Sequence, residues 1–250
     1  KEWDYKRTGA KVFSFQRAYG AGAAKIAAST GMAVEDVEAL IAAENARYPE
    51  IDAYYEDLTK QIARNRVPSG YAVPHPDIPG IMCHLGTSSY RAPDGKLYTY
   101  REQPSPEYLV KRGTYSSFSP TEIKNYVVQG EGGEWAKAAM TLAVRAFYRR
   151  RNFGHRALLV NQVHDAVYGD FHEDVKLEAA ALLHACMEAA SDYMEYLFDW
   201  EVPVPVPSDT TWGQSMMDEE SIDGLTELAS QFRLELRNEY MGGYTPSFLH

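Results

Sequence analysis

The chain has few cysteines and no long apolar run. Its 250 residues include only two cysteines, Cys83 and Cys186, which lack the paired spacing of a disulfide framework or a zinc site. No uninterrupted apolar stretch approaches the roughly 20 residues that a membrane-spanning helix needs, and the first residues show no signal-peptide pattern. These absences favour a reducing, cytoplasmic setting away from the membrane.

An excess of basic residues is also absent, because the net charge is −10. The charge is unevenly spread, however. Residues 1–25 carry six Lys and Arg against two acidic residues, whereas residues 216–250 carry seven acidic residues against two arginines. A ligand responds to the field within a Debye length of about 10 Å. Net charge therefore does not exclude a nucleic-acid partner.

The N-terminal half is expected to be helical and then irregular. Apolar residues at helical spacing predict helices through residues 4–66, among them segments at 34–47 and 51–64. Prolines and glycines then divide residues 67–120 into short segments. Within these, Pro93-Asp94-Gly95 lies between two strand-like runs and predicts a hairpin.

The C-terminal half mixes long helices with a short sheet. A helix is expected over 121–148, and the sequence leaves open whether it is interrupted near 130–133. Two strands are expected within 157–171, followed by an amphipathic helix over 175–197. An extended edge strand over 202–206 and a helix around 221–239, in an acidic appendix, complete the expected elements. The tail helix is expected to dock on this chain or on a partner, and the sequence does not say which.

The most informative run is Arg7-Thr-Gly-Ala-Lys11-Val-Phe-Ser-Phe15-Gln-Arg-Ala-Tyr19-Gly20. Arg7, Lys11, Phe15 and Tyr19 recur every fourth residue, so a helix would place them on one side. Two cations followed by two aromatic rings suit a nucleotide, with phosphates at one end and a flat ring at the other. The alternative is a helix with aromatic residues in the core and cations that reach outward.

Two later segments carry further candidate residues. Asn125 and Gln129 lie one helical turn apart and could present amides to one partner, or be a helix cap and an exposed amide. Gln162-Val-His164-Asp165 is predicted to be the tip of a hairpin. An Asp there can meet Mg²⁺, which takes one or two carboxylates plus phosphates and waters. An ordinary polar turn is the alternative.

These three runs, in this order, resemble family A DNA polymerases of the bacterial DNA polymerase I and phage replicase group. The first resembles motif B of the fingers helix, the second the Asn-x3-Gln-Gly segment, and the third motif C, Gln-Val-His-Asp-Glu. Two departures stand out. Glu131-Gly-Gly-Glu134 replaces the usual Thr-Ala-Ala-Asp, and Ala166 replaces the final Glu of motif C.

The resemblance implies a role for each matched residue. Arg7 and Lys11 would bind the dNTP triphosphate, and Lys11 would also donate a proton to pyrophosphate. Phe15 would flank the incoming sugar, and Tyr19 and Gly20 would lie where the template base enters. Asn125 and Gln129 would face the minor groove of the primer–template. Gln162 and His164 would lie near the primer end, and Asp165 would be a ligand of Mg²⁺.

The implied fold is α+β, the C-terminal part of a right-hand polymerase domain. Helical fingers would occupy 1–66, a hairpin connection 67–120, half of an antiparallel palm sheet with packed helices 121–215, and the acidic appendix 216–250. Motif A, which supplies the family's other metal-binding Asp, has no counterpart in this sequence. The resemblance therefore implies that motif A and the thumb come from another polypeptide or an N-terminal region.

The implied activity is template-directed DNA synthesis on a primer–template, with dNTPs, Mg²⁺ and that N-terminal part as partners. The phage-like sequence around Gly20 implies a phage replicase in a host cytoplasm. An alternative is a polymerase-derived subunit that binds DNA or a partner and has lost its chemistry. RNA synthesis, as in single-subunit phage transcriptases, is a third option and is disfavoured by the DNA-type motifs.

Overall fold

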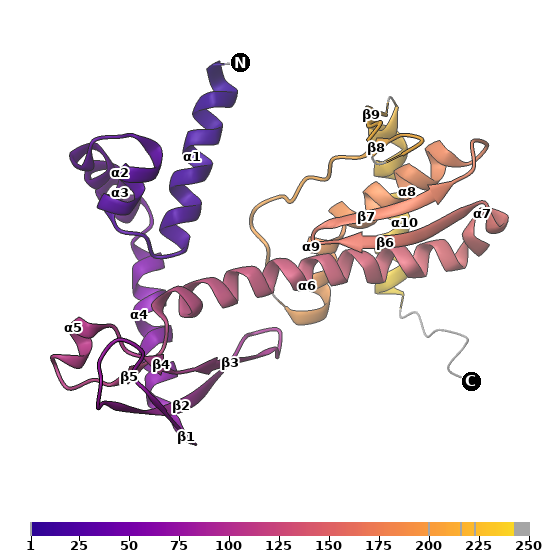
Figure 1. Ribbon diagram of the computed structural model, residues 1–250. Helices are drawn as coiled ribbons and strands as arrows, with labels where there is room; N and C mark the ends of the chain where they lie inside the picture. The colour runs from indigo at the N-terminus through magenta and orange to yellow at the C-terminus, as the bar shows by residue number, and fades with distance from the viewer. Residues whose placement is uncertain (1, 200, 216, 223, 243–250) are drawn as a thin grey trace. The chain divides into compact units, whose positions relative to one another are not determined.

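The structure is a computed structural model that describes residues 2–199, 201–215, 217–222 and 224–242. Helices and small antiparallel sheets make up the chain (Figure 1), which agrees with the expected mixed α and β composition. Contacts divide it into two compact units that meet in sequence between Gln129 and Gly130. Among the described residues, no helix is both long and apolar enough to cross a membrane.

The N-terminal unit begins with four helices and continues with short strands. Its elements are α1 (Glu2–Ala18), α2 (Ala23–Thr30), α3 (Val34–Arg47), α4 (Pro49–Arg64), β1 (Val67–Pro74), β2 (Met82–Arg91), β3 (Leu97–Arg101), β4 (Gln103–Pro104), α5 (Glu107–Val110), β5 (Ser116–Ser117) and the first part of α6 (Pro120–Arg149). The predicted helices at 34–47 and 51–64 are confirmed, as is the hairpin, in which β2 pairs with β3 around the turn at Asp94.

Two apolar clusters hold this unit together. In the first, Ile26 of α2 and Val37 of α3 are fully buried, and Phe13 of α1 packs against them. The second joins α4 to the sheet and to α6. Its members are Leu58, Ile62, Ala92, Tyr98, Tyr100, Ile123 and Val127. The start of α6 is thereby fixed to α4 and β3.

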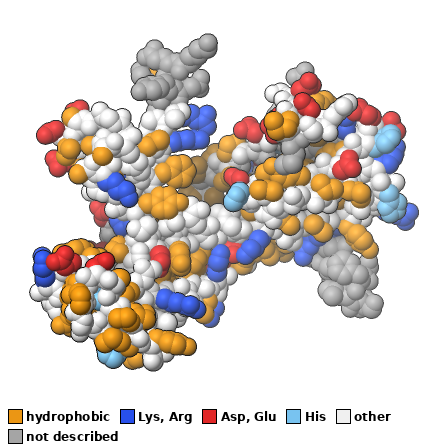
Figure 2. Space-filling model, in the orientation of Figure 1, with side chains coloured by type: hydrophobic (Ala, Val, Ile, Leu, Met, Phe, Trp, Pro, Cys, Tyr) orange, Lys and Arg blue, Asp and Glu red, His pale blue; other side chains and the backbone are white. Residues whose placement is uncertain are grey.

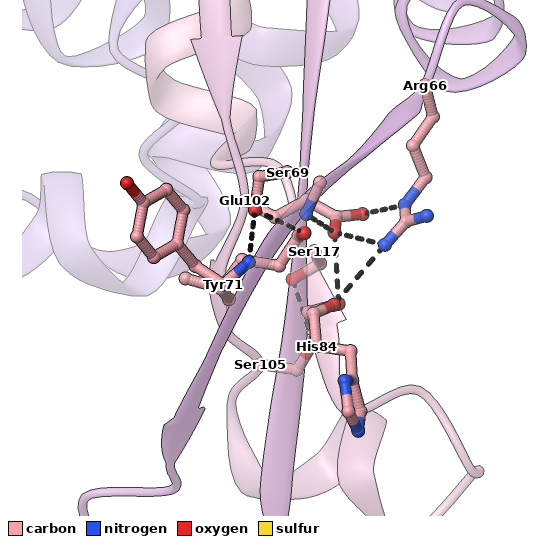
Figure 3. A network of polar contacts seen from close by, with 10 residues as sticks. Arg66, Ser69, Tyr71, His84, Glu102, Ser105 and Ser117 are labelled. Carbon is pink, nitrogen blue, oxygen red and sulfur yellow. Dashed lines mark hydrogen bonds and ion pairs between the residues drawn. The ribbon is translucent and has the colours of Figure 1, made fainter.

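A buried carboxylate ties the strands of this unit together (Figure 3). Glu102 accepts two hydrogen bonds from Arg66, each of 2.8 Å, one from the Gly86 amide at 2.6 Å and one from Ser116 at 3.1 Å. Burial alone would raise the pKa of the Glu102 carboxyl, but the hydrogen bonds from Arg66, Ser116 and Gly86 outweigh it and lower the pKa below its ordinary value.

The C-terminal unit packs helices against a hairpin (Figure 1). Its further elements are α7 (Arg151–His155), β6 (Ala157–Val163), β7 (Ala166–Phe171), α8 (Lys176–Glu188), α9 (Ala190–Phe198), β8 (Thr211–Trp212), β9 (Glu220–Ser221) and α10 (Leu225–Met241). The predicted strands and their turn are confirmed. Phe147 of α6 stacks on Phe171 of β7 with centroids 5.7 Å apart, which joins the long helix to the hairpin.

Two expectations for this half are corrected, and one question that the sequence left open is answered. Helix α6 runs without a break through Gly130–Gly133, because packed residues on both sides of the glycines stabilise it. The predicted helix over 175–197 is two helices, α8 and α9, which meet at Ala189, and α8 is buried almost all round rather than amphipathic. Residues 202–206 form no strand, since Pro203 and Pro205 lack the N–H groups that pairing needs.

Helix α10 of the acidic appendix docks on this chain. Leu225, Phe232 and Leu236 enter the core that contains α6 and α8. Residues 216, 223 and 243–250 of the appendix lie outside the described part of the chain. The sequence pattern alone left the docking partner open, and the structure assigns it to the C-terminal unit itself.

Acidic residues of α10 also pair with basic residues at the end of α6. Glu235 lies 2.6 Å from Arg150, and Glu239 pairs with both Arg149 and Arg150. Arg150 also lies over the Phe232 ring, 5.2 Å from its centroid. These contacts hold Arg149 and Arg150 against the tail helix.

Candidate functional site

The row of cations and aromatic rings on α1 faces away from the core. Arg7 and Lys11 are exposed, Phe15 is 57% exposed and Tyr19 is 41% exposed. The aromatic residue that anchors the helix is Phe13, which packs against the first apolar cluster. The alternative in which the spaced aromatic residues form the core is therefore wrong. Neither Arg7 nor Lys11 has a hydrogen bond or ion pair within the described residues, so both cations can receive an anionic ligand.

The helix ends in a sharp turn at Tyr19-Gly20. The Tyr19 amide still donates to the Phe15 carbonyl at 3.0 Å, but Gly20 has φ 78°, a left-handed conformation in which glycine avoids the strain of a side chain. The Tyr19 carbonyl accepts a hydrogen bond of 3.2 Å from Thr121 Oγ1 at the start of α6. The turn at the end of α1 is thus attached to α6, although 102 residues separate the two partners.

Asn125 and Gln129 continue along α6 from that contact point. Residues four apart on a helix differ by about 40° in direction, so Thr121, Asn125 and Gln129 form one row. Ile123 and Val127 are buried in the second apolar cluster, on the opposite side of the helix. The structure therefore brings Tyr19, Gly20, Asn125 and Gln129 into one continuous region of the N-terminal unit.

Aromatic packing fixes the direction of this row. The Tyr126 ring, next to Asn125, stacks on the Tyr100 ring of β3 with centroids 5.6 Å apart. Burial, with smaller contributions from neighbouring Tyr90 and Tyr126, raises the pKa of Tyr100 to about 12. Tyr100 therefore stays neutral at any physiological pH and acts as a packing residue.

A cavity of about 140 Å³ lies beside this region. It is bounded by α1, α3, α4 and α6, and Arg17, Tyr55 and Lys124 contribute to its wall. Arg17 is already bonded to Glu44 and Asn45, each at 2.9 Å. None of the residues of the cation–aromatic row lines the cavity, so the nucleotide expected from the sequence would bind elsewhere, on the exposed side of α1.

In the C-terminal unit, the hairpin presents Asp165 at its tip. Val163 pairs with Ala166, which leaves His164 and Asp165 as the two turn residues. His164 has φ 54°, in keeping with the positive φ that two-residue hairpin turns need, and Gln162 Nε2 donates to its carbonyl at 3.1 Å. The side chains of Gln162, His164 and Asp165 are all exposed. Each can contact a ligand that approaches the tip.

Asp165 suits a hard cation and is the one carboxylate among residues 162–166. Ala166 occupies the next position, and Asp170 lies opposite Leu158, about 14 Å from Ala166 at ordinary strand rise. Within the described residues there is no group of three or more His, Cys, Asp and Glu side chains that could hold a metal ion. Asp165 can supply one ligand to Mg²⁺, with the others from phosphates, water or a further carboxylate.

Sequence reasoning missed Thr121, which links two of the predicted segments. Thr121 lies one helical turn before Asn125, so a search for residues four apart would have extended the Asn125–Gln129 pair to it. Its bond to Tyr19 could not be foreseen, since no local pattern specifies a contact of that sequence separation.

Comparison with known proteins gives one clear result. The profile of the family described as DNA polymerase family A matches residues 3–218, which include all three candidate segments and most of the chain. Searches among curated proteins and among solved structures each gave no match. The matched region ends before α10, so the docked tail helix lies outside it. On the extent of this match, the chain belongs to DNA polymerase family A.

Proposed function

We propose that this chain is the C-terminal, catalytic part of a replicative DNA polymerase that adds dNTPs to a primer 3′-hydroxyl. The observation that carries the proposal is that one family match spans both the exposed cation–aromatic row of α1 and the Asp165 hairpin. We assign residues 1–66 to the fingers and 121–215 to the palm. The phage-like motif B favours a phage enzyme that works in a host cytoplasm.

The α1 row would bind the incoming dNTP. Arg7 and Lys11 lie about one helical turn apart, so two adjacent phosphate groups can each contact a cation. Lys11 would also donate its proton to the departing pyrophosphate. Phe15 would then cover the sugar. The exposure of all three side chains supports this assignment, as does the absence of a partner for either cation within the part of the chain that the structure describes.

The region formed by Tyr19, Gly20, Asn125 and Gln129 would hold the template and the nascent base pair. Tyr19 and Gly20 would form the place where the template base enters, because Gly20 leaves the turn without a side chain. Asn125 and Gln129 would donate to minor-groove acceptors, which every base pair presents, and so would monitor pair geometry independently of sequence. Their position on one side of α6, where Asn125 is half-buried and Gln129 is exposed, supports this role.

Asp165 would be a ligand of Mg²⁺, with Gln162 and His164 beside the primer end. When bound, the ion supplies charge neutralisation and orientation for the phosphates and the 3′-hydroxyl. The exposed carboxylate on a two-residue turn fits such a ligand. The rest of the ligand set would include the aspartate of motif A, contributed by a further region of the polymerase.

The hairpin itself supports the need for that region. A sheet of two strands is marginal in water, and β6 exposes Leu158, Val160 and Val163 by 44%, 58% and 42%. Figure 2 shows hydrophobic side chains on the visible surface of this unit. We infer that the region that carries motif A extends this sheet and that it belongs to the same polypeptide or to a separate one.

The experiment is primer extension by the native assembly with Mg²⁺ and dNTPs. We expect Asp165→Asn to lower extension by about 1,000-fold or more, since several kcal/mol of metal-assisted stabilisation would be lost. Asp170→Asn, an equal charge change at the far end of the same hairpin, is the matched control and should extend normally. Extension by the Asp165→Asn assembly at the wild-type rate would refute the proposal. Full activity of the isolated 250-residue chain would refute the need for a further region.

A second candidate function is a binding subunit that has lost its chemistry. Ala166 favours it, because it occupies the place where the family has a second carboxylate. Under this alternative the native assembly would bind DNA without extending a primer, and Asp165→Asn would leave that DNA binding unchanged. Retention of Arg7, Lys11 and Asp165 together favours the enzyme, because a DNA-binding subunit has no need for a metal-binding carboxylate.

A further inference from the structure

One face of the β2–β3 hairpin in the N-terminal unit carries exposed charged and polar side chains, with Thr87 and Ser89 half-buried among them. In the β2–β3 hairpin, Thr87 pairs with Arg101, Ser89 with Thr99, and Arg91 with Leu97. Alternate residues of paired strands point to the same side, so one face carries all six of these side chains. Leu97 is 53% exposed, and Arg91, Thr99 and Arg101 are also exposed. We call this set the outer face.

The opposite face of the same strands is the packed one. Tyr98 and Tyr100 are buried against Leu58 and Ile62 of α4, and Ser88 Oγ donates to the Ile62 carbonyl at 2.7 Å. This packing holds the hairpin rigidly. The outer face is therefore backed by packed side chains, and its exposed residues Arg91, Thr99 and Arg101 can meet a ligand.

The outer face carries positive charge and hydroxyl groups but no carboxylate. Arg91 donates one hydrogen bond to the Gly95 carbonyl at 2.6 Å, and Arg101 has no ion pair or hydrogen bond within the described residues. Two acids are near in sequence: Glu102 has its carboxylate bound by Arg66, Gly86 and Ser116 (Figure 3), and Asp94 in the hairpin turn accepts a hydrogen bond of 2.9 Å from the Lys96 amide. In a chain of net charge −10, this face is locally cationic.

The arrangement matches the sugar–phosphate backbone of a nucleic acid. Arg and Ser or Thr side chains are common donors to phosphate oxygens. Arg91 and Arg101 mark opposite corners, about 14 Å apart along the strands at ordinary strand rise, and the hydroxyls of Ser89 and Thr99 lie between them. The face has no aromatic ring on which a base could stack, so its contacts would be independent of sequence.

We propose that the outer face of the β2–β3 hairpin binds a DNA backbone, with Arg91 and Arg101 as the phosphate-binding cations. This proposal rests on the proposed function for its choice of DNA as the ligand. It adds to the polymerase a second backbone contact, apart from α1 and from the motif C hairpin. Its role is to hold the DNA strand that enters or leaves, not to take part in nucleotidyl transfer.

The test is DNA binding by the full 250-residue chain over a series of salt concentrations. The probe is a fluorescent oligonucleotide, single-stranded in one arm and duplex in the other, read by anisotropy. For the Arg91→Ala/Arg101→Ala variant we expect weaker binding and a smaller salt slope. Loss of two phosphate contacts lowers the slope by about 1.4 for a single strand and about 1.8 for a duplex. The affected arm identifies the form of DNA that is bound.

Two controls keep the result specific. Arg112→Ala removes an exposed arginine outside the outer face, so it should leave the slope unchanged. Thr99→Val removes a hydroxyl without changing charge, so it should weaken binding and leave the slope as it is. Thermal melting of each variant confirms that the fold is intact, since these side chains lie outside the apolar clusters.

Several outcomes would overturn the proposal. The first three are a wild-type salt slope for the double variant, a decrease in slope for Arg112→Ala equal to that of the double variant, and no binding of either DNA form. The fourth is displacement of the probe by poly-glutamate at a far lower concentration than by unlabelled DNA, which would indicate an acidic protein partner. The Asp165→Asn extension assay is independent. If the double variant binds DNA normally and Asp165→Asn abolishes extension, only the outer-face proposal is rejected. If the double variant binds DNA more weakly and Asp165→Asn extends normally, only the proposed function is rejected.

Discussion

Thr121 Oγ1 donates a hydrogen bond to the Tyr19 carbonyl across 3.2 Å. The bond joins the end of the helix that carries Arg7 and Lys11 to the start of the helix that carries Asn125 and Gln129. In a family A polymerase these are the expected nucleotide and minor-groove segments. A single hydroxyl therefore couples the position of Tyr19 to the row of amides on α6.

The first prediction concerns Thr121→Val, which keeps the shape and removes the donor. Loss of one exposed hydrogen bond should cost about 0.5–1.5 kcal/mol of stability. If Thr121 positions Tyr19, then the assembly should also show a higher KM for dNTP at nearly unchanged kcat. Steady-state primer extension checks this. Thr121→Ser keeps the donor and should restore the wild-type KM, whereas a purely structural residue would move the melting temperature and leave KM alone.

The second prediction concerns acid stability at Glu102. Its pKa is lowered in the folded chain, so its ionised form stabilises the fold above the ordinary glutamate pKa of about 4.3, and that contribution is lost as the pH falls through the lower folded value. In the Arg66–Glu102 ion pair the carboxylate is buried and the guanidinium is partly exposed. We therefore expect Glu102→Gln to lower the free energy of unfolding at neutral pH by about 2–3 kcal/mol, a value between those typical of exposed and of fully buried ion pairs. Urea unfolding at several pH values should show a flatter acid limb for the variant. An unchanged acid limb would contradict the assigned role.

The third prediction concerns the docked tail helix. Leu236 is 2% exposed within the core of the C-terminal unit, so Leu236→Ala should lower the free energy of unfolding by about 2–5 kcal/mol. Leu234, on the same helix, is 67% exposed, and Leu234→Ala should change it by less than about 0.5 kcal/mol. Chemical denaturation of both variants measures the difference. Equal effects would mean that α10 does not dock as described.

The fourth prediction contrasts two glycines. Gly133 lies inside α6, and nothing lies within 4 Å of the position of an added Cβ, so Gly133→Ala should stabilise the chain by about 0.5–1 kcal/mol. Gly20 has φ 78°, so Gly20→Ala should destabilise by about 1–2 kcal/mol. Thermal melting compares the two variants. Destabilisation by Gly133→Ala would indicate a break in α6 at the glycines.

Local pattern determined much of the fold because each segment carries its own signal. The apolar spacing from Val34 to Arg47 specifies a helix whatever surrounds it, and the structure has α3 at those residues. The hairpin turn at His164-Asp165 follows from strand-forming residues on both sides of two polar ones. The motifs also sufficed to identify the family. The roles of Arg7, Lys11 and Asp165 stay predictions, since they depend on ligands.

Local pattern failed where a longer-range packing partner decides the outcome. The glycines at 132 and 133 left a break in the helix open, and the packed segments before and after them keep α6 continuous. Alternating prolines and valines at 202–206 suggested an edge strand, yet no described strand pairs with them. A glycine inside a helix costs about 1 kcal/mol relative to alanine, which tertiary packing readily exceeds. At 202–206 the reason is different, because Pro203 and Pro205 lack the N–H groups that strand pairing needs.

The sequence by itself determined that the chain is a member of DNA polymerase family A, with a row of cations and aromatic residues on a helix and a carboxylate at a hairpin turn, because these are encoded in spacings of a few residues. Only the tertiary structure decided that Phe13 and not Phe15 anchors α1, that Thr121 holds Tyr19, and that α10 covers Arg149 and Arg150. Each of these depends on which distant segment lies opposite, and that is settled by the burial of apolar surface over the whole unit.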